Sequence, residues 1–221
     1  MTDPIQHHDR PELSAAALRE WGAHVECVLR GIGHSLNNRA AALSAVLELA
    51  RDSSGGSTQE DPAVLTSILG SEVERVTGLV AVVRSIAAPR QQPDAFVASD
   101  AAAEALAVLK LHAEQRDRKI VFDSSATPLR VPRWMFVRAL IALAAAAPSG
   151  KAEVRIVIAD RNEWLETHVD AVPPIPLTPL VTELAGAMRG EPLAEDATGG
   201  GGYGFRVPTL SALRRLEGRG G

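Results

Sequence analysis

Apolar residues recur every three or four positions through two long stretches near the N-terminus. The first stretch runs from about Glu12 to Arg51 without an internal proline, which is typical of one long amphipathic helix. The second begins with Asp61 and Pro62, a pair typical of a helix start, and ends just after Ala88. Because a run of serines and glycines separates the two stretches, the pattern predicts a helical hairpin.

Beyond a short polar linker the pattern changes to alternating strand-like and helix-like segments. We predict, in order, a helix over 99–115, a strand over 119–123, a helix over 132–147, strands over 153–159 and 164–169, a helix over 177–189, a strand over 203–207 and a short final helix. A sheet covered on one face by helices is the simplest architecture for this order. The expected fold is therefore α+β, with a loose tail over 1–11, a helical hairpin over 12–89 and an α/β sandwich over 94–221.

Each predicted helix of the hairpin carries an apolar stripe that nothing else in the hairpin covers. In the first helix the following residues fall within about 60° of Ile32: Leu18, Val25, Leu29, Leu36, Leu43, Leu47 and Ala50. Two hairpins related by a two-fold axis would bury such stripes in a four-helix bundle, so we expect a homodimer. Arg39 falls inside the stripe, and we expect its guanidinium either to extend to solvent or to meet a carboxylate across the bundle.

Composition argues against several classes of function. The 221-residue chain has a net charge of −4, which disfavours a nucleic-acid-binding module that relies on neutralising phosphates. Cys27 is the only cysteine, and no stretch has the length and apolarity of a membrane span or a signal peptide. The histidines show no metal-ligand spacing. We therefore expect a cytoplasmic location, with no metal site, no membrane contact and no nucleic acid.

His34 points away from the apolar stripe. Its helical angle is about 200° from that of Ile32, and Asn38 follows one turn later on the same exposed edge. An unperturbed histidine side chain is mostly in its neutral form near pH 7, and the neutral ring can attack phosphorus, while the amide of Asn38 can orient a water molecule or a phosphoryl oxygen. From the helical angle alone, His34 is either such a nucleophile or an ordinary surface histidine.

The segment VLRGIGHSLNN, which ends at Asn38, resembles the phosphoacceptor segment of sensor histidine kinases, whose usual form is His-Glu-Leu-Asn-Asn. The hairpin is similar to the dimerisation and phosphotransfer domain of that family, and residues 94–208 are similar to its ATP-binding domain. The resemblance implies that His34 is the phosphoacceptor. It also implies that Ser35 replaces the acidic neighbour that assists autophosphorylation in the family.

The C-terminal part departs from that family where the nucleotide would bind. Ala142 and Ala146 stand at the positions that match its metal-binding asparagine, and Asp170 is followed by Ala-Val-Pro-Pro instead of a glycine-containing adenine loop. Alanine offers no ligand to Mg²⁺, and prolines prevent close approach of the backbone to a nucleotide. We therefore expect no cofactor on this chain and no ATP-dependent kinase activity.

These departures make the chain resemble the histidine phosphotransferases that are built on a degenerate kinase core. In such a protein, His34 carries a phosphoryl group between the receiver domains of response regulators, and the receiver supplies the Mg²⁺. Two alternatives stay open. One is a binding or scaffold protein that docks response regulators without phosphotransfer, and the other is a weakly active histidine kinase.

Overall fold

The computed structural model describes residues 12–53, 62–87, 95–147, 153–170, 177–193 and 203–218. The predicted tail over 1–11, the prolines that follow Asp170 and the glycine run that precedes Tyr203 lie outside these residues.

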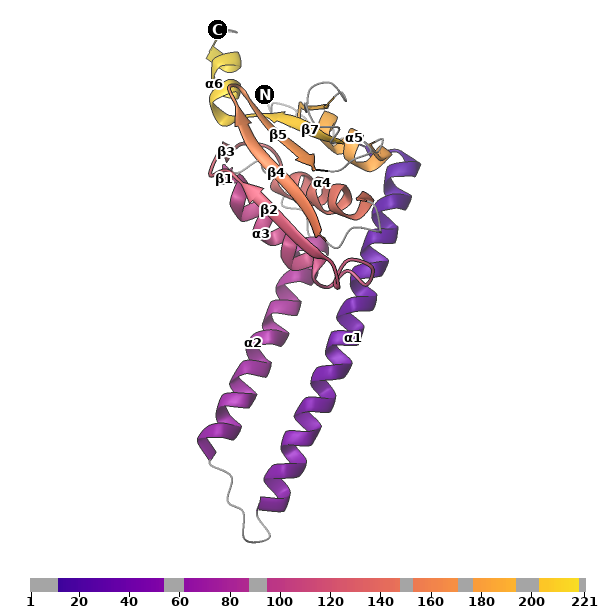
Figure 1. Ribbon diagram of the computed structural model, residues 1–221, viewed down its shortest axis with the longest axis vertical. Coiled ribbons are helices and arrows are strands. Elements are labelled where there is room, and N and C mark those ends of the chain that lie inside the picture. Colours follow the sequence, from indigo (N-terminus) through magenta and orange to yellow (C-terminus); the bar gives the residue numbers. More distant parts are fainter. Residues whose placement is uncertain are drawn as a thin grey trace, which may run out of the picture.

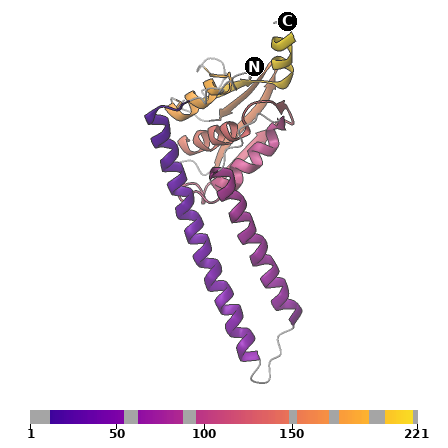
Figure 2. The same cartoon turned by 180° about the vertical axis from the view of Figure 1, so that it is seen from behind.

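Two long antiparallel helices, α1 (Ala15–Ser53) and α2 (Pro62–Ala87), form the predicted hairpin (Figure 1). At 1.5 Å per residue, α1 is about 58 Å long. The α/β domain lies beside the first half of α1, and the second half extends away from it together with α2 (Figures 1 and 2). Among the described residues, no helix combines the length and the apolarity that a membrane crossing requires.

Within its described residues, the α/β domain contains one five-stranded sheet, a two-stranded ribbon and four helices. The strands are β1 (Phe96–Val97), β2 (Lys119–Ser124), β3 (Pro128–Leu129), β4 (Glu153–Arg161), β5 (Trp164–Val169), β6 (Glu191–Pro192) and β7 (Tyr203–Pro208), and the helices are α3 (Ala98–Leu109), α4 (Arg133–Ala146), α5 (Pro179–Ala187) and α6 (Leu210–Gly218). The sheet order is β2-β4-β5-β7-β6, in which only β2 and β4 are parallel, and β1 pairs with β3.

The core of this domain lies between one face of the sheet and helices α3, α4 and α5 (Figure 2). Alternate residues of β4 show the arrangement, because Val154, Ile156 and Ile158 are buried whereas Glu153 and Arg155 face solvent. The predicted α+β fold, a helical hairpin followed by a sheet with helices on one face, is confirmed.

Some boundaries differ from the prediction. Helix α3 ends at Leu109, six residues before the predicted end at 115, and the connection over 110–118 runs as successive turns to β2. Its Ala113 N–H donates to the Cys27 carbonyl of α1, so packing against α1 replaces the last helical turns. Strands β1, β3 and β6 were not predicted, because two residues cannot display an alternating pattern.

The apolar residues of α1 lie on two neighbouring faces, and four members of the stripe predicted around Ile32 lie on the exposed one. The inner face packs against α2 and the α/β domain, and its buried members are Ala17, Trp21, Val28, Ile32 and Val46. The outer face is exposed, with Leu18 at 55%, Leu29 at 53%, Leu36 at 43% and Leu47 at 55%. Adjacent residues in a helix point about 100° apart, so the two faces run side by side along the helix.

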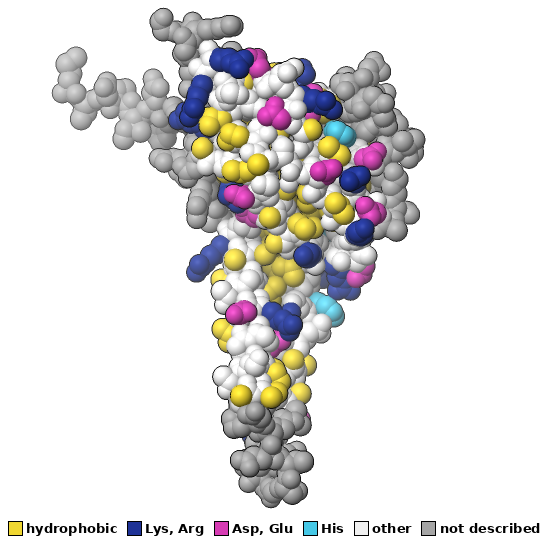
Figure 3. All heavy atoms as spheres, turned by 60° about the vertical axis from the view of Figure 1, so that its left-hand side comes forward, with side chains coloured by type: hydrophobic (Ala, Val, Ile, Leu, Met, Phe, Trp, Pro, Cys, Tyr) yellow, Lys and Arg dark blue, Asp and Glu magenta, His cyan; other side chains and the backbone are white. Residues whose placement is uncertain are grey.

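Helix α2 has the same division. Leu79 and Val82 are buried on its inner face, whereas four exposed apolar residues form its outer face: Leu69, Val73, Val80 and Val83. Val64 and Ile68 share the side of Leu79 but are exposed, in the first turns of the helix. Figure 3 shows hydrophobic side chains gathered along the hairpin below the α/β domain. The outer faces of α1 and α2 have no partner within the described part of the chain.

Candidate functional site

His34 lies near the middle of α1, and its side chain is exposed, as its helical angle predicts. Asn38, one turn later, is also exposed, and its amide Nδ2 lies 3.3 Å from His34 Nε2. An amide NH₂ group can only donate, so Nε2 of His34 accepts this hydrogen bond through its lone pair. A neutral imidazole carries one proton, which therefore resides on Nδ1. With the Asn38 amide in this orientation, Nε2 is the ring nitrogen that carries the lone pair.

Ser35 does not share the surface of His34. It is half-buried and lies towards the inner face of α1, about 100° around the helix from its neighbour. A hydroxyl group cannot act as a base as a carboxylate can, and the Ser35 side chain also points away from His34 Nε2.

Arg39 meets a carboxylate across the hairpin, which is one of the two outcomes expected from the sequence. Its Nη1 lies 2.8 Å from Glu72 Oε2 of α2, and Arg75 Nη1 lies 2.6 Å from the other oxygen of the same carboxylate. The hydrogen bond from Arg39 lowers the pKa of Glu72, and the hydrogen bond from Arg75 lowers it further. The bridged carboxylate links α1 to α2 about one turn beyond His34.

The connection over 110–118 contacts α1 one turn before His34. A Cβ atom added to Gly31 would lie 1.6 Å from the carbonyl oxygen of Leu111, so the two backbones approach more closely than any side chain permits. The Ala113 N–H also donates to the Cys27 carbonyl at 3.1 Å. These contacts place the edge of the α/β domain next to the candidate phosphoacceptor.

Arg138 joins three helices at the other side of the domain junction. Its guanidinium carbon lies 4.4 Å from the ring centre of Trp21 on α1 and 4.7 Å from that of Trp134 on α4. Its Nη2 donates to the carbonyl of Ile86, at the end of α2, at 3.1 Å. Burial lowers the pKa of Arg138 to about 10, so the guanidinium remains charged near neutral pH and the cation–π contacts persist.

Helix α4 does not fit the Mg-nucleotide site that the resemblance would place on it. Ala142 is fully buried in the core, Ala146 is half-buried, and no Asp, Glu, Asn or His occurs anywhere in the helix. Oxygen ligands are what Mg²⁺ requires, and this helix supplies none from its side chains. Asp170 is exposed, and the Ala-Val-Pro-Pro segment after it lies outside the described residues. No group of three potential metal ligands occurs within the part of the chain that is described.

Comparisons with known proteins give structural likeness only. No protein-family model and no curated protein matches the chain. Among solved structures, the histidine kinase AdeS of Acinetobacter baumannii is 18% identical, with 80% of this chain and 96% of that chain covered, at a TM-score of 0.40. A histidine kinase of Burkholderia phymatum is 17% identical, with 90% and 99% covered, at a TM-score of 0.40.

A third solved structure is that of the histidine kinase ThkA in complex with the response regulator TrrA. It is 13% identical, with 87% of this chain and 65% of that chain covered, at a TM-score of 0.40. At this level of similarity, the likenesses establish neither a family nor an activity for this chain, and its fold is described from its own structure.

The structure also brings together residues that the sequence does not connect. His24 of α1 and His112 of the 110–118 connection lie side by side, 88 positions apart in sequence. Neither residue belongs to a recognisable motif, and the apolar residues around them predict only packing. No sequence signal could have paired them, because the pairing depends on how the α/β domain docks on α1.

Proposed function

We propose that this chain is a histidine phosphotransferase of a two-component phosphorelay, in which His34 carries a phosphoryl group between the receiver domains of response regulators. The observation that carries the proposal is an exposed imidazole on a helix surface, with its Nε2 lone pair held by Asn38. An ordinary surface histidine needs no such partner. The lack of oxygen ligands on α4 favours a receiver, rather than ATP, as the phosphoryl donor.

The proposed step is an in-line displacement at phosphorus. The lone pair of His34 Nε2 forms a bond to the phosphorus of an aspartyl phosphate, the bond from phosphorus to the aspartyl oxygen breaks, and the carboxylate leaves with that electron pair. The Nδ1 proton of His34 is then free to pass to solvent. Asn38 gives up its bond to Nε2 before the attack, which leaves its NH₂ group positioned to donate to a phosphoryl oxygen.

In this proposal the receiver holds the Mg²⁺ that neutralises the transferring phosphoryl group, and this chain binds no cofactor of its own. The α/β domain serves as a docking surface for the receiver. Its 110–118 connection supports this role, because it contacts α1 at Gly31, three residues before His34.

We further propose that the chain works as a homodimer. The outer faces of α1 and α2 present exposed leucines and valines along the hairpin, and burying them against a second copy would remove apolar surface from water. A four-helix bundle formed in this way leaves His34 accessible, since its side chain does not belong to either outer face.

A transfer assay tests the proposal. Candidate response-regulator receivers are phosphorylated with a small-molecule phosphoryl donor, freed of the donor and mixed with the full chain. We expect an acid-labile phosphate to appear on the chain and then to pass to a second receiver. His168→Gln, a substitution on β5 of the sheet, should leave the transfer unchanged. Tight receiver binding without transfer would contradict the proposal and would favour a scaffold function.

A further inference from the structure

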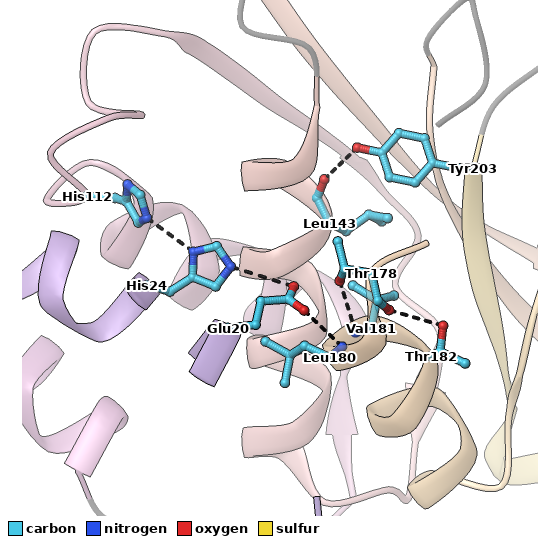
Figure 4. A network of polar contacts seen from close by, with 9 residues as sticks. All are labelled: Glu20, His24, His112, Leu143, Thr178, Leu180, Val181, Thr182 and Tyr203. Carbon is cyan, nitrogen blue, oxygen red and sulfur yellow. Dashed lines mark hydrogen bonds and ion pairs between the residues drawn. The ribbon is translucent and has the colours of Figure 1, made fainter. Parts of the chain in front are cut away.

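A continuous series of polar contacts links three elements where the α/β domain docks on α1 (Figure 4). The Glu114 N–H donates to Nδ1 of His112 at 3.4 Å, and Nε2 of His112 lies 3.3 Å from Nδ1 of His24. Nε2 of His24 lies 4.0 Å from Oε1 of Glu20, whose other carboxylate oxygen accepts from the Leu180 N–H at 3.1 Å. The series therefore runs from the 110–118 connection through α1 to the first turn of α5.

From Glu114 to Glu20 the donors of this series all point in one direction, and the Leu180 N–H donates to the Glu20 carboxylate from the other end. Nδ1 of His112 accepts from a backbone N–H, so its proton resides on Nε2 and is donated to Nδ1 of His24. The remaining proton of His24 then lies on Nε2, which faces the Glu20 carboxylate. Each ring holds one proton in this arrangement. A second proton on His112 would face the Glu114 N–H, and a second proton on His24 would face the N–H of His112. In each case two hydrogen-bond donors would point at each other, and the hydrogen bond would be lost.

The surroundings of the pair also favour neutral rings. His112 is 1% exposed, and burial together with the charge of His24 lowers its pKa to about 4. Burial lowers the pKa of His24 as well. The charged groups that face the pair are Glu20 and Arg30 of α1 and Glu114 of the connection, and the carboxylate of Glu114 only partly offsets the effect of burial.

We propose that the His24–His112 pair makes the docking of the α/β domain on α1 dependent on pH. With both rings neutral, the 110–118 connection and the first turn of α5 stay on α1. Protonation of the rings releases both segments from α1, the connection near Gly31, about one turn before His34, and the first turn of α5 at Glu20. This inference does not require His34 to carry a phosphoryl group.

The size of the effect follows from the titration of the released rings. Once undocked, each histidine faces water and titrates near its ordinary pKa of about 6.5. Because docking lowers both pKa values, its stabilisation is complete above about pH 6.5 and is lost as the pH falls below that value. Between pH 7.5 and pH 5.5 the released His112 ring favours undocking about tenfold, because its docked pKa of about 4 lies well below this range, and the released His24 ring adds to the effect in the same direction.

Hydrogen exchange on the full chain measures this opening directly. Two amides report on it, those of Ala113 and Leu180, because each donates across the docking contact to α1. After correction for the intrinsic pH dependence of exchange, we expect both to exchange more than about tenfold faster at pH 5.5 than at pH 7.5. Amides of the β4–β5 pairing should keep their protection. An unchanged ratio at the two reporters, or equal acceleration in the sheet, would overturn the proposal.

Variants separate the pair from every other titrating group. In the double variant His24→Gln/His112→Gln the exchange ratio should fall to about one, whether that variant is docked or undocked at both pH values. The single variant His24→Gln should retain a ratio of about ten, because one titrating ring remains. His168→Gln removes a histidine of β5 whose pKa burial also lowers, and it should keep the full response of the unmodified chain. A full response in the double variant would overturn the assignment.

Discussion

Replacing Gly31 with alanine should destabilise the chain, although the same change in an exposed helix normally stabilises it. Alanine in place of glycine inside a helix contributes about 1 kcal/mol of stability. At Gly31 the new Cβ would lie 1.6 Å from the Leu111 carbonyl oxygen, so the 110–118 connection must retreat by more than an ångström. The Leu111 oxygen is a backbone atom and the position of the new Cβ is fixed by the backbone of α1, so no side-chain rotation can relieve the overlap.

The displacement of the 110–118 connection determines how much stability Gly31→Ala should cost. Overpacking of this kind costs about 3 kcal/mol, and loss of the Ala113 N–H to Cys27 carbonyl hydrogen bond adds about 1 kcal/mol. After the gain of about 1 kcal/mol from helix propensity is subtracted, Gly31→Ala should lower the free energy of unfolding by about 3 kcal/mol. For a chain of this length, that loss lowers the Tm by roughly 6–12 °C.

Two other glycines of α1 supply matched controls. An added Cβ at Gly22 or Gly33 meets nothing within 4 Å, so Gly22→Ala and Gly33→Ala should raise the free energy of unfolding by up to about 1 kcal/mol. Chemical denaturation followed by helical circular dichroism measures all three variants. The reasoning is refuted if Gly31→Ala stabilises the chain as the controls do.

Three further predictions test the proposed dimer, the missing nucleotide site and the role of Asn38. Light scattering at micromolar concentration should show a dimer for the unmodified chain and a monomer for Leu36→Glu, which places a charge on the exposed apolar face of α1. Ala45→Glu adds the same charge on the His34 side of α1 and should stay dimeric, and a monomeric unmodified chain would contradict the proposed four-helix bundle. Calorimetric titration with Mg-ATP should give no dissociation constant below about 1 mM, or roughly 4 kcal/mol of binding, and tighter binding would mean that the nucleotide site has been misplaced. Asn38→Ala should still accept a phosphoryl group, because the nucleophile remains, and should lose it more slowly to water; complete loss of transfer would show that Asn38 does more than orient the reacting groups.

The sequence allowed prediction of those features that depend on local periodicity. The exposure of His34 follows from its angle on one long helix, and the meeting of Arg39 with a carboxylate follows from a charge placed among apolar neighbours. The order of the longer strands and helices could also be predicted, because each contains several turns or alternations of its apolar pattern.

Features that depend on how the two parts of the chain dock could not be predicted. Nothing in the sequence distinguishes Gly31 from other helical glycines, because its role depends on contact with Leu111. His24 and His112 likewise form a pair only because the 110–118 connection packs against α1. The division of the apolar residues of α1 into a buried and an exposed face also depends on how α2 and the α/β domain pack against it. A hydropathy pattern shows which residues avoid water, but it does not show which neighbour each of them contacts.

The most direct test of the central claim is phosphorus NMR of the full chain mixed with a receiver domain that a small-molecule donor keeps phosphorylated. The account predicts one acid-labile phosphohistidine signal, with phosphorus bonded to Nε2 of His34, because the Asn38 contact leaves the lone pair on that nitrogen. The signal should vanish in His34→Gln, while the dimer stays intact and the free energy of unfolding changes by no more than about 0.5 kcal/mol, since the side chain is exposed. An undiminished signal in His34→Gln, or none in the wild type with receivers that bind it, would contradict the account.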